Sequence, residues 1–134
     1  MKCDGAVFML MVVSLAAACS NPTSPEIDIV TGRLIGKVTI GPICPVEQVT
    51  MPCPTPPEAY AARKVEIYDP SHAHLLKTVD IDSSGNYTVD MVVGNYVVDL
   101  KKVGIDRSAD VPRSVTILQG SIVRLDISID TGIR

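Results

Sequence analysis

Apolar and polar residues alternate along most of the chain after residue 31. A period of two predicts half-buried β-strands, because successive side chains of a strand point to opposite faces of a sheet. The pattern occurs in seven runs, which are 32–40, 62–68, 75–81, 87–91, 96–100, 115–117 and 123–130. Tight turn signals separate several runs, as at 82–85 and 94–95. Seven short strands with such turns predict a β-sandwich or a barrel, and no helical period of useful length follows Cys19.

The first eighteen residues have a different pattern. Residues 5–18 carry no charge, and so short a run cannot span a bilayer, for which a helix needs about 20 residues. It suits the apolar region of a secretory signal peptide, which ends in small residues. The run Leu15-Ala16-Ala17-Ala18 directly before Cys19 resembles the lipobox of bacterial lipoproteins. The resemblance implies a lipidated Cys19; the alternatives are ordinary secretion with a free thiol and a retained anchor.

These patterns divide the chain into four parts. We expect a lipoprotein signal peptide at 1–18, the lipidated Cys19 with a flexible tether at 19–31, the β-sandwich at 32–131 and a short tail at 132–134. The tether is polar and contains prolines, so it reads as a semi-extended linker without a core. A lipid at Cys19 would hold the protein at the cell membrane or outer membrane without a spanning helix.

Two cysteines, Cys44 and Cys53, remain in the expected domain. In an exported chain such a pair indicates a disulfide bond. A metal site generally has closer cysteines with further ligands, and a redox pair has the spacing C-x-x-C. Both residues lie in a proline-rich loop at 41–59. A pinned loop loses less entropy on binding, so this loop is either a surface for a partner or a cover over a sheet edge.

Four segments of the expected sandwich resemble one known family. They are Gly36–Ile40, Ala62–Tyr68, Asp82–Tyr87 and Val93–Val98. Their order and sequences are similar to the carboxypeptidase regulatory-like domain, with its G-x-V, D-x-x-G-x-Y and L-P-x-G-x-Y motifs. The resemblance covers most of residues 32–103 and implies a transthyretin-like, Greek-key β-sandwich. It also implies a non-catalytic accessory module.

Two short motifs have residue types that bind metals. The motif D-x-D-x-S-G, with Asp80 and Asp82, begins like a calcium loop but lacks the glutamate of an EF-hand at position 12. We interpret it as a hairpin turn. His72 and His74 could form half of a zinc or copper site, but no third ligand is near in sequence. We interpret them as part of a solvated loop and expect no metal and no cofactor.

Charge and composition exclude further classes of function. The formal net charge of −3 gives no basic surface for nucleic acid. The two histidines fall in one loop and no G-x-S-x-G motif occurs, so we expect no enzyme. Lys37 and Asp126 lie on strands that could be neighbours, as in an isopeptide bond, but their period turns both outward. We expect them to be two solvated charges.

Aromatic residues bear on the binding surface, because sugar-binding sandwiches use exposed rings. Tyr87 and Tyr96 fall on the core faces of their runs, which leaves the other two tyrosines. The candidate binding surface therefore consists of Cys44, Cys53, Tyr60 and Tyr68. We expect a monomeric, lipid-anchored envelope protein with a structural or binding role toward an envelope protein or glycan. A carbohydrate- or peptide-binding accessory module and a small metal-binding protein are the alternatives.

Overall fold

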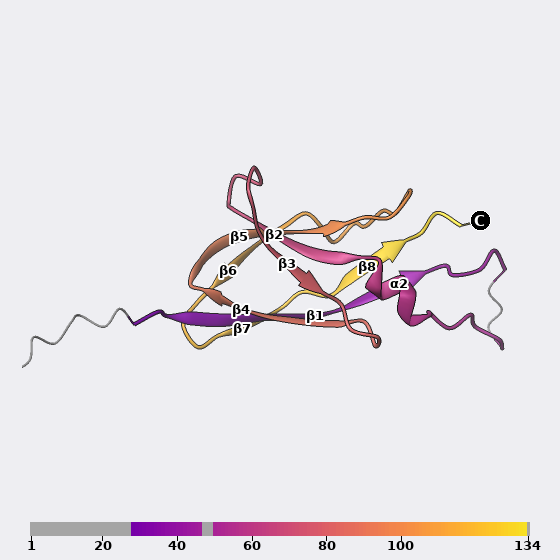
Figure 1. The fold of residues 1–134 in the computed structure, drawn as a ribbon, viewed down its shortest axis with the longest axis horizontal. Helices are drawn as coiled ribbons and strands as arrows, with labels where there is room; N and C mark the ends of the chain where they lie inside the picture. Colours follow the sequence, from indigo (N-terminus) through magenta and orange to yellow (C-terminus); the bar gives the residue numbers. More distant parts are fainter. Residues whose placement is uncertain (1–27, 47–49, 134) are drawn as a thin grey trace, which may run out of the picture.

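The computed structural model describes two stretches of the chain, residues 28–46 and 50–133. The expected signal peptide, Cys19 and the tether up to residue 27 lie outside the described residues. The elements of the two stretches are β1 (Thr31–Gly41), α2 (Pro57–Ala61), β2 (Lys64–Tyr68), β3 (Leu75–Asp80), β4 (Asn86–Val92), β5 (Gly94–Lys101), β6 (Arg113–Ile117), β7 (Ile122–Arg124) and β8 (Ile127–Asp130). Figure 1 shows β1 running along the length of the molecule.

The strands form two sheets of four strands each, which lie one above the other in Figure 1. In the first sheet β1 is central, with β4 antiparallel on one side and β7 and β8 parallel on the other. The second sheet has the order β3-β2-β5-β6 and is antiparallel throughout. Two sheets facing each other confirm the β-sandwich and distinguish it from a barrel.

Side chains that face inward from both sheets form one hydrophobic core. Every second residue of β1 and β4 is buried, as the alternation in the sequence predicts. The most deeply buried large side chains come from both sheets and are Leu34, Val38, Val65, Ile67, Val98, Ile117 and Ile127. The period-two interpretation of these runs is therefore confirmed.

The edge strand β3 departs from the prediction, because only Val79 of its six residues is buried. The alternation places Leu75 inward, but its side chain is half exposed. A bulge between Ile67 and Tyr68 shifts the pairing of β2 with β3 at this point, and bulges re-aim the residues beside them. The Lys77 ammonium reaches the carbonyl oxygen of Asp90 on β4 at 3.4 Å. A charge at the edge of a sandwich discourages pairing with another chain.

The last predicted run, 123–130, is interrupted, so it gives two strands where the pattern predicts one. The phenol of Tyr87 donates a hydrogen bond to the carbonyl oxygen of Leu125. The backbone N–H of Lys37 then donates to the carboxylate of Asp126 at 2.9 Å, in place of a backbone acceptor. The carboxylate of Asp126 thus takes the place of a backbone acceptor beside β1, while the side chain of Lys37 stays exposed.

The short helix α2 was not predicted, since most of its segment falls within the predicted proline-rich loop. Pro57 occupies the first turn, where the missing N–H of proline costs nothing. The helix closes one end of the sandwich and turns Tyr60 into the core. Within residues 28–46 and 50–133, helices of the length and hydrophobicity required to cross a bilayer do not occur.

Candidate functional site

The candidate site lies at the end of the sandwich where β1 leads toward α2, at the right of Figure 1. A disulfide bond joins Cys44 to Cys53, with 6.4 Å between their Cα atoms. The disulfide predicted from the cysteines is therefore confirmed. The hydroxyl of Thr131 donates to the carbonyl oxygen of Pro42 at 2.6 Å, and the hydroxyl of Thr55 reaches that of Ile40 at 3.4 Å. The segment is thus attached to the sandwich at both of its ends.

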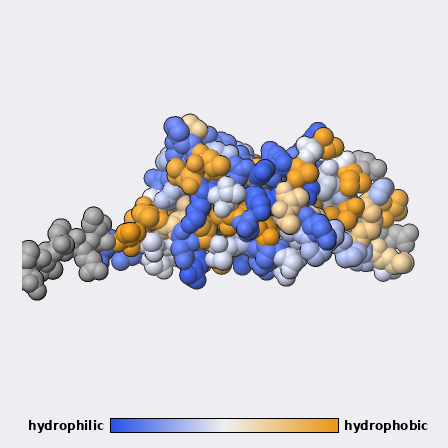
Figure 2. Space-filling view, viewed as in Figure 1, coloured by the Kyte–Doolittle hydropathy of each residue, from blue (hydrophilic) through white to orange (hydrophobic). Residues whose placement is uncertain are grey.

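Apolar side chains are exposed at this end, which we call the disulfide end. Val46 and Met51 of the loop are 71% and 73% exposed. The connection between β5 and β6 and the C-terminal tail add Val103, Ile105 and Ile133. Figure 2 shows hydrophobic side chains gathered at the right of the molecule. Solvent-exposed apolar side chains that cluster in this way mark surfaces for binding.

A cavity of about 430 Å³ opens at the disulfide end, with Val103, Ile105 and Ile133 among its lining residues. Its apolar wall comes from β1, the loop, α2, the connection between β5 and β6, and the tail, and includes Ile40, Ile43, Ala59, Ile105 and Ile133. Its polar wall is the ion pair of Arg63 and Asp106. An apolar hollow with a few placed polar groups is the usual form of a binding pocket.

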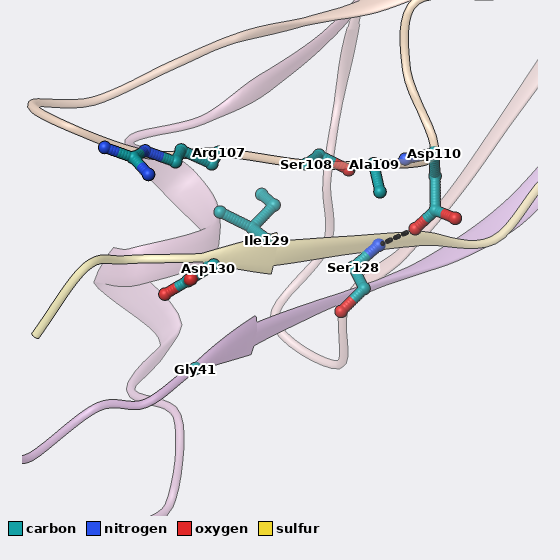
Figure 3. Close-up of a pocket in the computed structure, with 8 residues that line it drawn as sticks. All are labelled: Gly41, Arg107, Ser108, Ala109, Asp110, Ser128, Ile129 and Asp130. Atoms are coloured by element: carbon teal, nitrogen blue, oxygen red, sulfur yellow. Dashed lines mark hydrogen bonds between the residues drawn. The ribbon is translucent and has the colours of Figure 1, made fainter.

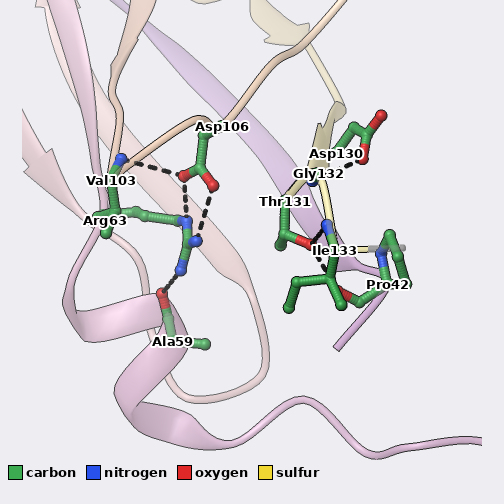
Figure 4. Close-up of polar contacts among 9 residues, drawn as sticks. All are labelled: Pro42, Ala59, Arg63, Val103, Asp106, Asp130, Thr131, Gly132 and Ile133. Carbon is green, nitrogen blue, oxygen red and sulfur yellow. Dashed lines mark hydrogen bonds and ion pairs between the residues drawn. The ribbon is translucent and has the colours of Figure 1, made fainter. Parts of the chain in front are cut away.

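The ion pair holds α2 against the connection between β5 and β6 (Figure 4). The guanidinium of Arg63 donates to both carboxylate oxygens of Asp106, at 2.6 and 2.9 Å, and to the carbonyl oxygen of Ala59 at 2.8 Å. The carboxylate also accepts the N–H of Val103 at 3.1 Å and is only 3% exposed. Burial opposes ionisation of Asp106, but the hydrogen bonds from Arg63 and Val103 outweigh it and lower its pKa.

Sequence reasoning missed this ion pair, although one signal for Arg63 existed. Arg63 is two residues before Val65 and four before Ile67, so in the predicted strand it lies on the same inward face. A buried arginine requires an acidic partner. Nothing in the sequence points to Asp106 as that partner, because 43 residues separate the two.

A second cavity, of about 610 Å³, follows the outer edge of β8. Figure 3 shows residues 107–110 lying along this edge. Arg107 and Asp130 exchange backbone hydrogen bonds of 2.8 and 2.7 Å, and the N–H of Ser128 donates to Asp110 at 2.8 Å. The segment thus covers a strand edge that would otherwise be open to pairing with another chain.

Neither candidate tyrosine presents an exposed ring at the disulfide end. Tyr60 lies near this end but is buried, and Tyr68 lies elsewhere. Tyr60 is only 8% exposed, so the expectation that its ring is exposed is wrong. Its ring packs against Gly85, whose φ of +89° and missing side chain allow the close approach. Tyr68 is the last residue of β2, at the end of that strand away from α2 (Figure 1). Its hydroxyl donates to Glu66 at 2.6 Å, and this bond, with burial and the charges of Glu66 and Asp99, raises the pKa of Tyr68 to about 12.

The two histidines lie in the loop between β2 and β3 and take different partners. His72 lies 3.0 Å from the carboxylate of Asp99, whereas His74 lies 2.9 Å from that of Asp69. The bond with His74, together with the backbone N–H groups of the loop, lowers the pKa of Asp69. The histidines are therefore tied to separate carboxylates and do not converge on one site.

The acidic motif after β3 forms a turn. One carboxylate oxygen of Asp82 accepts the N–H groups of Ser84 and Asn86, both at 2.9 Å. Asp80 pairs instead with Lys64 on the neighbouring strand. The hairpin interpretation of this motif is thereby supported. Across the part of the chain that the structure describes, no three His, Cys, Asp or Glu side chains are grouped as metal ligands.

Comparison with known proteins informs the fold only. No protein-family model matches the chain, and no curated protein matches it. Among solved structures it is similar to GBS52, a minor pilin of Streptococcus agalactiae, with a TM-score of 0.51 and 18% identity over 75% of this chain and 44% of the pilin. A DUF3823 family protein from Parabacteroides merdae matches at a TM-score of 0.46 and 14% identity, over 76% of this chain and 47% of that one. The chain thus spans less than half of these proteins, and the likeness to the pilin supports a β-sandwich.

Proposed function

We propose that the protein is an exported, lipid-anchored module without catalytic activity, which presents its disulfide end to another protein of the cell envelope. The observation that carries the proposal is the position of the disulfide loop, with its exposed apolar side chains, at the end opposite the start of β1. The sandwich is proposed to be the transthyretin-like, Greek-key domain implied by the sequence resemblance. Export is supported by the disulfide, which forms in oxidising compartments.

The length of β1 separates the two ends of the molecule. This strand has 11 residues, and a strand rises about 3.3 Å per residue, so it spans roughly 35 Å. If Cys19 carries the lipid, the chain rises from the membrane into the start of β1. The disulfide loop then lies one strand length farther from the lipidated residue, along the molecule, than the point where the domain begins.

The surface chemistry favours a protein over a glycan as the partner. The large hydrophobic side chains exposed at the disulfide end are aliphatic residues and a methionine. Sugar-binding sandwiches use exposed aromatic rings, and the tyrosine nearest this end, Tyr60, is buried. Methionine adapts its shape to a partner, and a loop closed by a disulfide loses less entropy on binding.

Photo-crosslinking in the native cell tests the proposal. A photoreactive amino acid at Met51 should give a discrete adduct with an envelope protein, whereas the same group at Thr78, on the exposed face of the second sheet, should not. The variant Val46→Ser/Met51→Ser should lose the adduct and keep its folding stability. Equal labelling from both positions would contradict the assignment of the binding end.

The disulfide and the anchor have tests of their own. Cys44→Ser/Cys53→Ser should weaken the adduct as well as the fold; lost stability with full capture would show that the loop is only a cover. Globomycin blocks lipoprotein signal peptidase, so it should block processing at Cys19. Mature protein made in its presence would refute the anchor.

A further inference from the structure

The opposite end of the sandwich, where β1 begins, also exposes apolar side chains. We call these five residues the N-terminal surface: Ile29, Val92, Val93, Leu118 and Ile122. Their exposed fractions run from 38% for Val93 to 70% for Ile29. Nothing in the proposed binding function uses this surface, which is a strand length away from the disulfide loop. Five exposed aliphatic side chains at one end of a small domain require an explanation.

Backbone hydrogen bonds bring these side chains together from three parts of the chain. The N–H of Val93, in the turn between β4 and β5, donates to the carbonyl oxygen of Val30 at 3.1 Å. The N–H of Gly120, in the turn between β6 and β7, donates to that of Thr31 at 3.0 Å. Figure 1 shows both turns beside the start of β1, at the left of the molecule. These hydrogen bonds fix both turns, and the apolar side chains on them, against the start of β1.

The charges beside this surface largely cancel. Arg33 and Asp90 form an ion pair of 2.7 Å between β1 and β4. Hydrogen bonding to Arg33 lowers the pKa of Asp90, which keeps the pair ionised at neutral pH. The exposed carboxylate of Asp28, just before Ile29, and the ammonium of Lys77, near Asp90, add one charge of each sign. With no excess of positive charge among the described residues at this end, contact with a surface must depend on apolar burial rather than on attraction to anionic groups.

The tether determines which surface this end meets. Ten residue steps separate Cys19 from Ile29, and even a fully extended chain of this length spans only about 35 Å. A flexible chain of ten residues has a root-mean-square span of about 16–19 Å. A lipid at Cys19 would therefore keep the N-terminal surface close to the bilayer at all times. Such tethering makes a contact effectively intramolecular, so weak apolar burial is sufficient to hold it.

We propose that the N-terminal surface docks on the bilayer that holds the lipid anchor, with its aliphatic side chains at the boundary of headgroups and acyl chains. The inference rests on the lipid anchoring proposed above. Docking would fix the sandwich upright, so that the disulfide end points away from the membrane instead of sweeping around the tether. The surface thus sets the orientation in which the partner meets the protein.

Depth-dependent fluorescence quenching tests the orientation. The mature lipidated protein, with the 44–53 disulfide intact, is reconstituted in phosphatidylcholine vesicles, and its mass confirms the lipid on Cys19. An NBD label is placed at Ile122→Cys or, as the matched control, at Ile105→Cys on the disulfide end. Quenching by spin-labelled lipid should be at least threefold stronger at position 122. It should persist in 1 M salt, because the contact is apolar.

The outcomes separate this inference from the proposed function. Equal quenching at both positions in lipidated protein would overturn docking and leave the anchored binding module intact. A disulfide crosslink between copies of unlabelled Ile122→Cys under mild oxidation, with no lipid quenching of the labelled protein, would show that a second copy covers the surface, which also overturns docking. An unlipidated Cys19 would remove the anchor and the inference with it. In Leu118→Ser/Ile122→Ser, labelled at Val93→Cys, quenching should fall toward the control value while the unfolding transition is retained.

Discussion

The two ends of the sandwich expose similar side chains but are built in different ways. The N-terminal end consists of tight turns that bond to the backbone of β1. The disulfide end contains a long proline-rich segment, which a disulfide, two threonine hydroxyls and a buried ion pair hold in place. A short turn fixes few residues and needs no crosslink, whereas ordering a long segment costs entropy that covalent and ionic links offset.

The difference shows which end can vary in sequence without disturbing the pairing of the strands. The turns of the N-terminal end continue the strands of both sheets, so a change in their length alters the strand pairing. The segment between β1 and α2 is attached through side chains and can change in sequence without moving a strand. Specific recognition is therefore expected at the disulfide end, and a generic contact with lipid at the N-terminal end.

Replacing Gly36 with alanine is expected to have the largest effect. Gly36 lies in the middle of β1, the strand that connects both ends, so the substitution disrupts packing on which both depend. An added Cβ would collide with the carbonyl oxygen of Leu125 and would lie 2.7 Å from the hydroxyl oxygen of Tyr87. We expect the free energy of unfolding to fall by more than about 3 kcal/mol. Urea unfolding measures the change. Gly41→Ala is the matched control, since its added Cβ meets nothing within 4 Å; equal losses in the two variants would contradict this packing argument.

Removing Arg63 should damage the disulfide end selectively. Arg63→Met leaves the carboxylate of Asp106 buried without its partner, which costs about 3 kcal/mol. Hydrogen exchange should rise in α2 and in the connection between β5 and β6, while the turns of the N-terminal end stay protected. Arg63→Met/Asp106→Leu should recover part of the stability, because no charge remains buried. A uniform rise in exchange would show that the two ends are not independent.

Acid should act through the same ion pair. The pKa of Asp106 is lowered in the folded protein, so its contribution to stability is complete above the ordinary carboxyl pKa of about 3.9. This contribution is lost as the pH falls below that value toward the lowered pKa. Between about pH 5 and pH 2, Arg63→Met/Asp106→Leu should therefore lose less stability than the wild type. Parallel curves of unfolding free energy against pH would refute this role for Asp106.

Opening the disulfide should have a smaller and local effect. In the chain-entropy model a loop of this length contributes about 2–3 kcal/mol. Cys44→Ser/Cys53→Ser should therefore lower the unfolding free energy by that amount and raise exchange between residues 41 and 56. Exchange in the turns at the other end should not change. If the substitution loosened both ends, the loop would have to contribute to the sandwich as a whole.

The smallest change in stability is expected from the exposed apolar residues themselves. Val46→Ser/Met51→Ser and Leu118→Ser/Ile122→Ser should each shift the unfolding free energy by less than about 0.5 kcal/mol. The first pair should affect only partner crosslinking, and the second only quenching by lipid. Thermal melts and the two binding measurements, made on the same preparations, separate these roles. A crossed result, in which the first pair abolishes quenching by lipid, would reverse the assignment of the ends.

The sequence predicts those features that depend on local pattern. The alternation locates the strands and most inward-facing residues, and the cysteines predict the disulfide. Helix α2 was missed because five residues are too few to show a helical period. The burial of Tyr60 was missed for the same reason, because its position in α2 directs its side chain into the core. The interruption of the last run depends on the hydroxyl of Tyr87, 38 residues from the carbonyl group that it contacts, and no local pattern contains that contact.

The candidate site was predicted only in part for the same reason. The disulfide loop was singled out because cysteine and proline are informative residue types. The other walls of the cavity come from the connection between β5 and β6 and from the C-terminal tail, which join the loop only through the fold. The ion pair of Arg63 and Asp106 is a contact of this long-range kind.

The position of β1 imposes an order of assembly on the chain. This strand is the first of the domain and the central one of its sheet, yet two of its partners, β7 and β8, are the last strands. During synthesis or passage through a membrane, β1 can pair with β4 long before residues 122–130 arrive. Until then one edge of the central strand stays open and the core is uncovered. Completion of the sheet therefore waits for residues 122–130, and loss of these residues would leave a nascent protein exposed to aggregation and proteolysis.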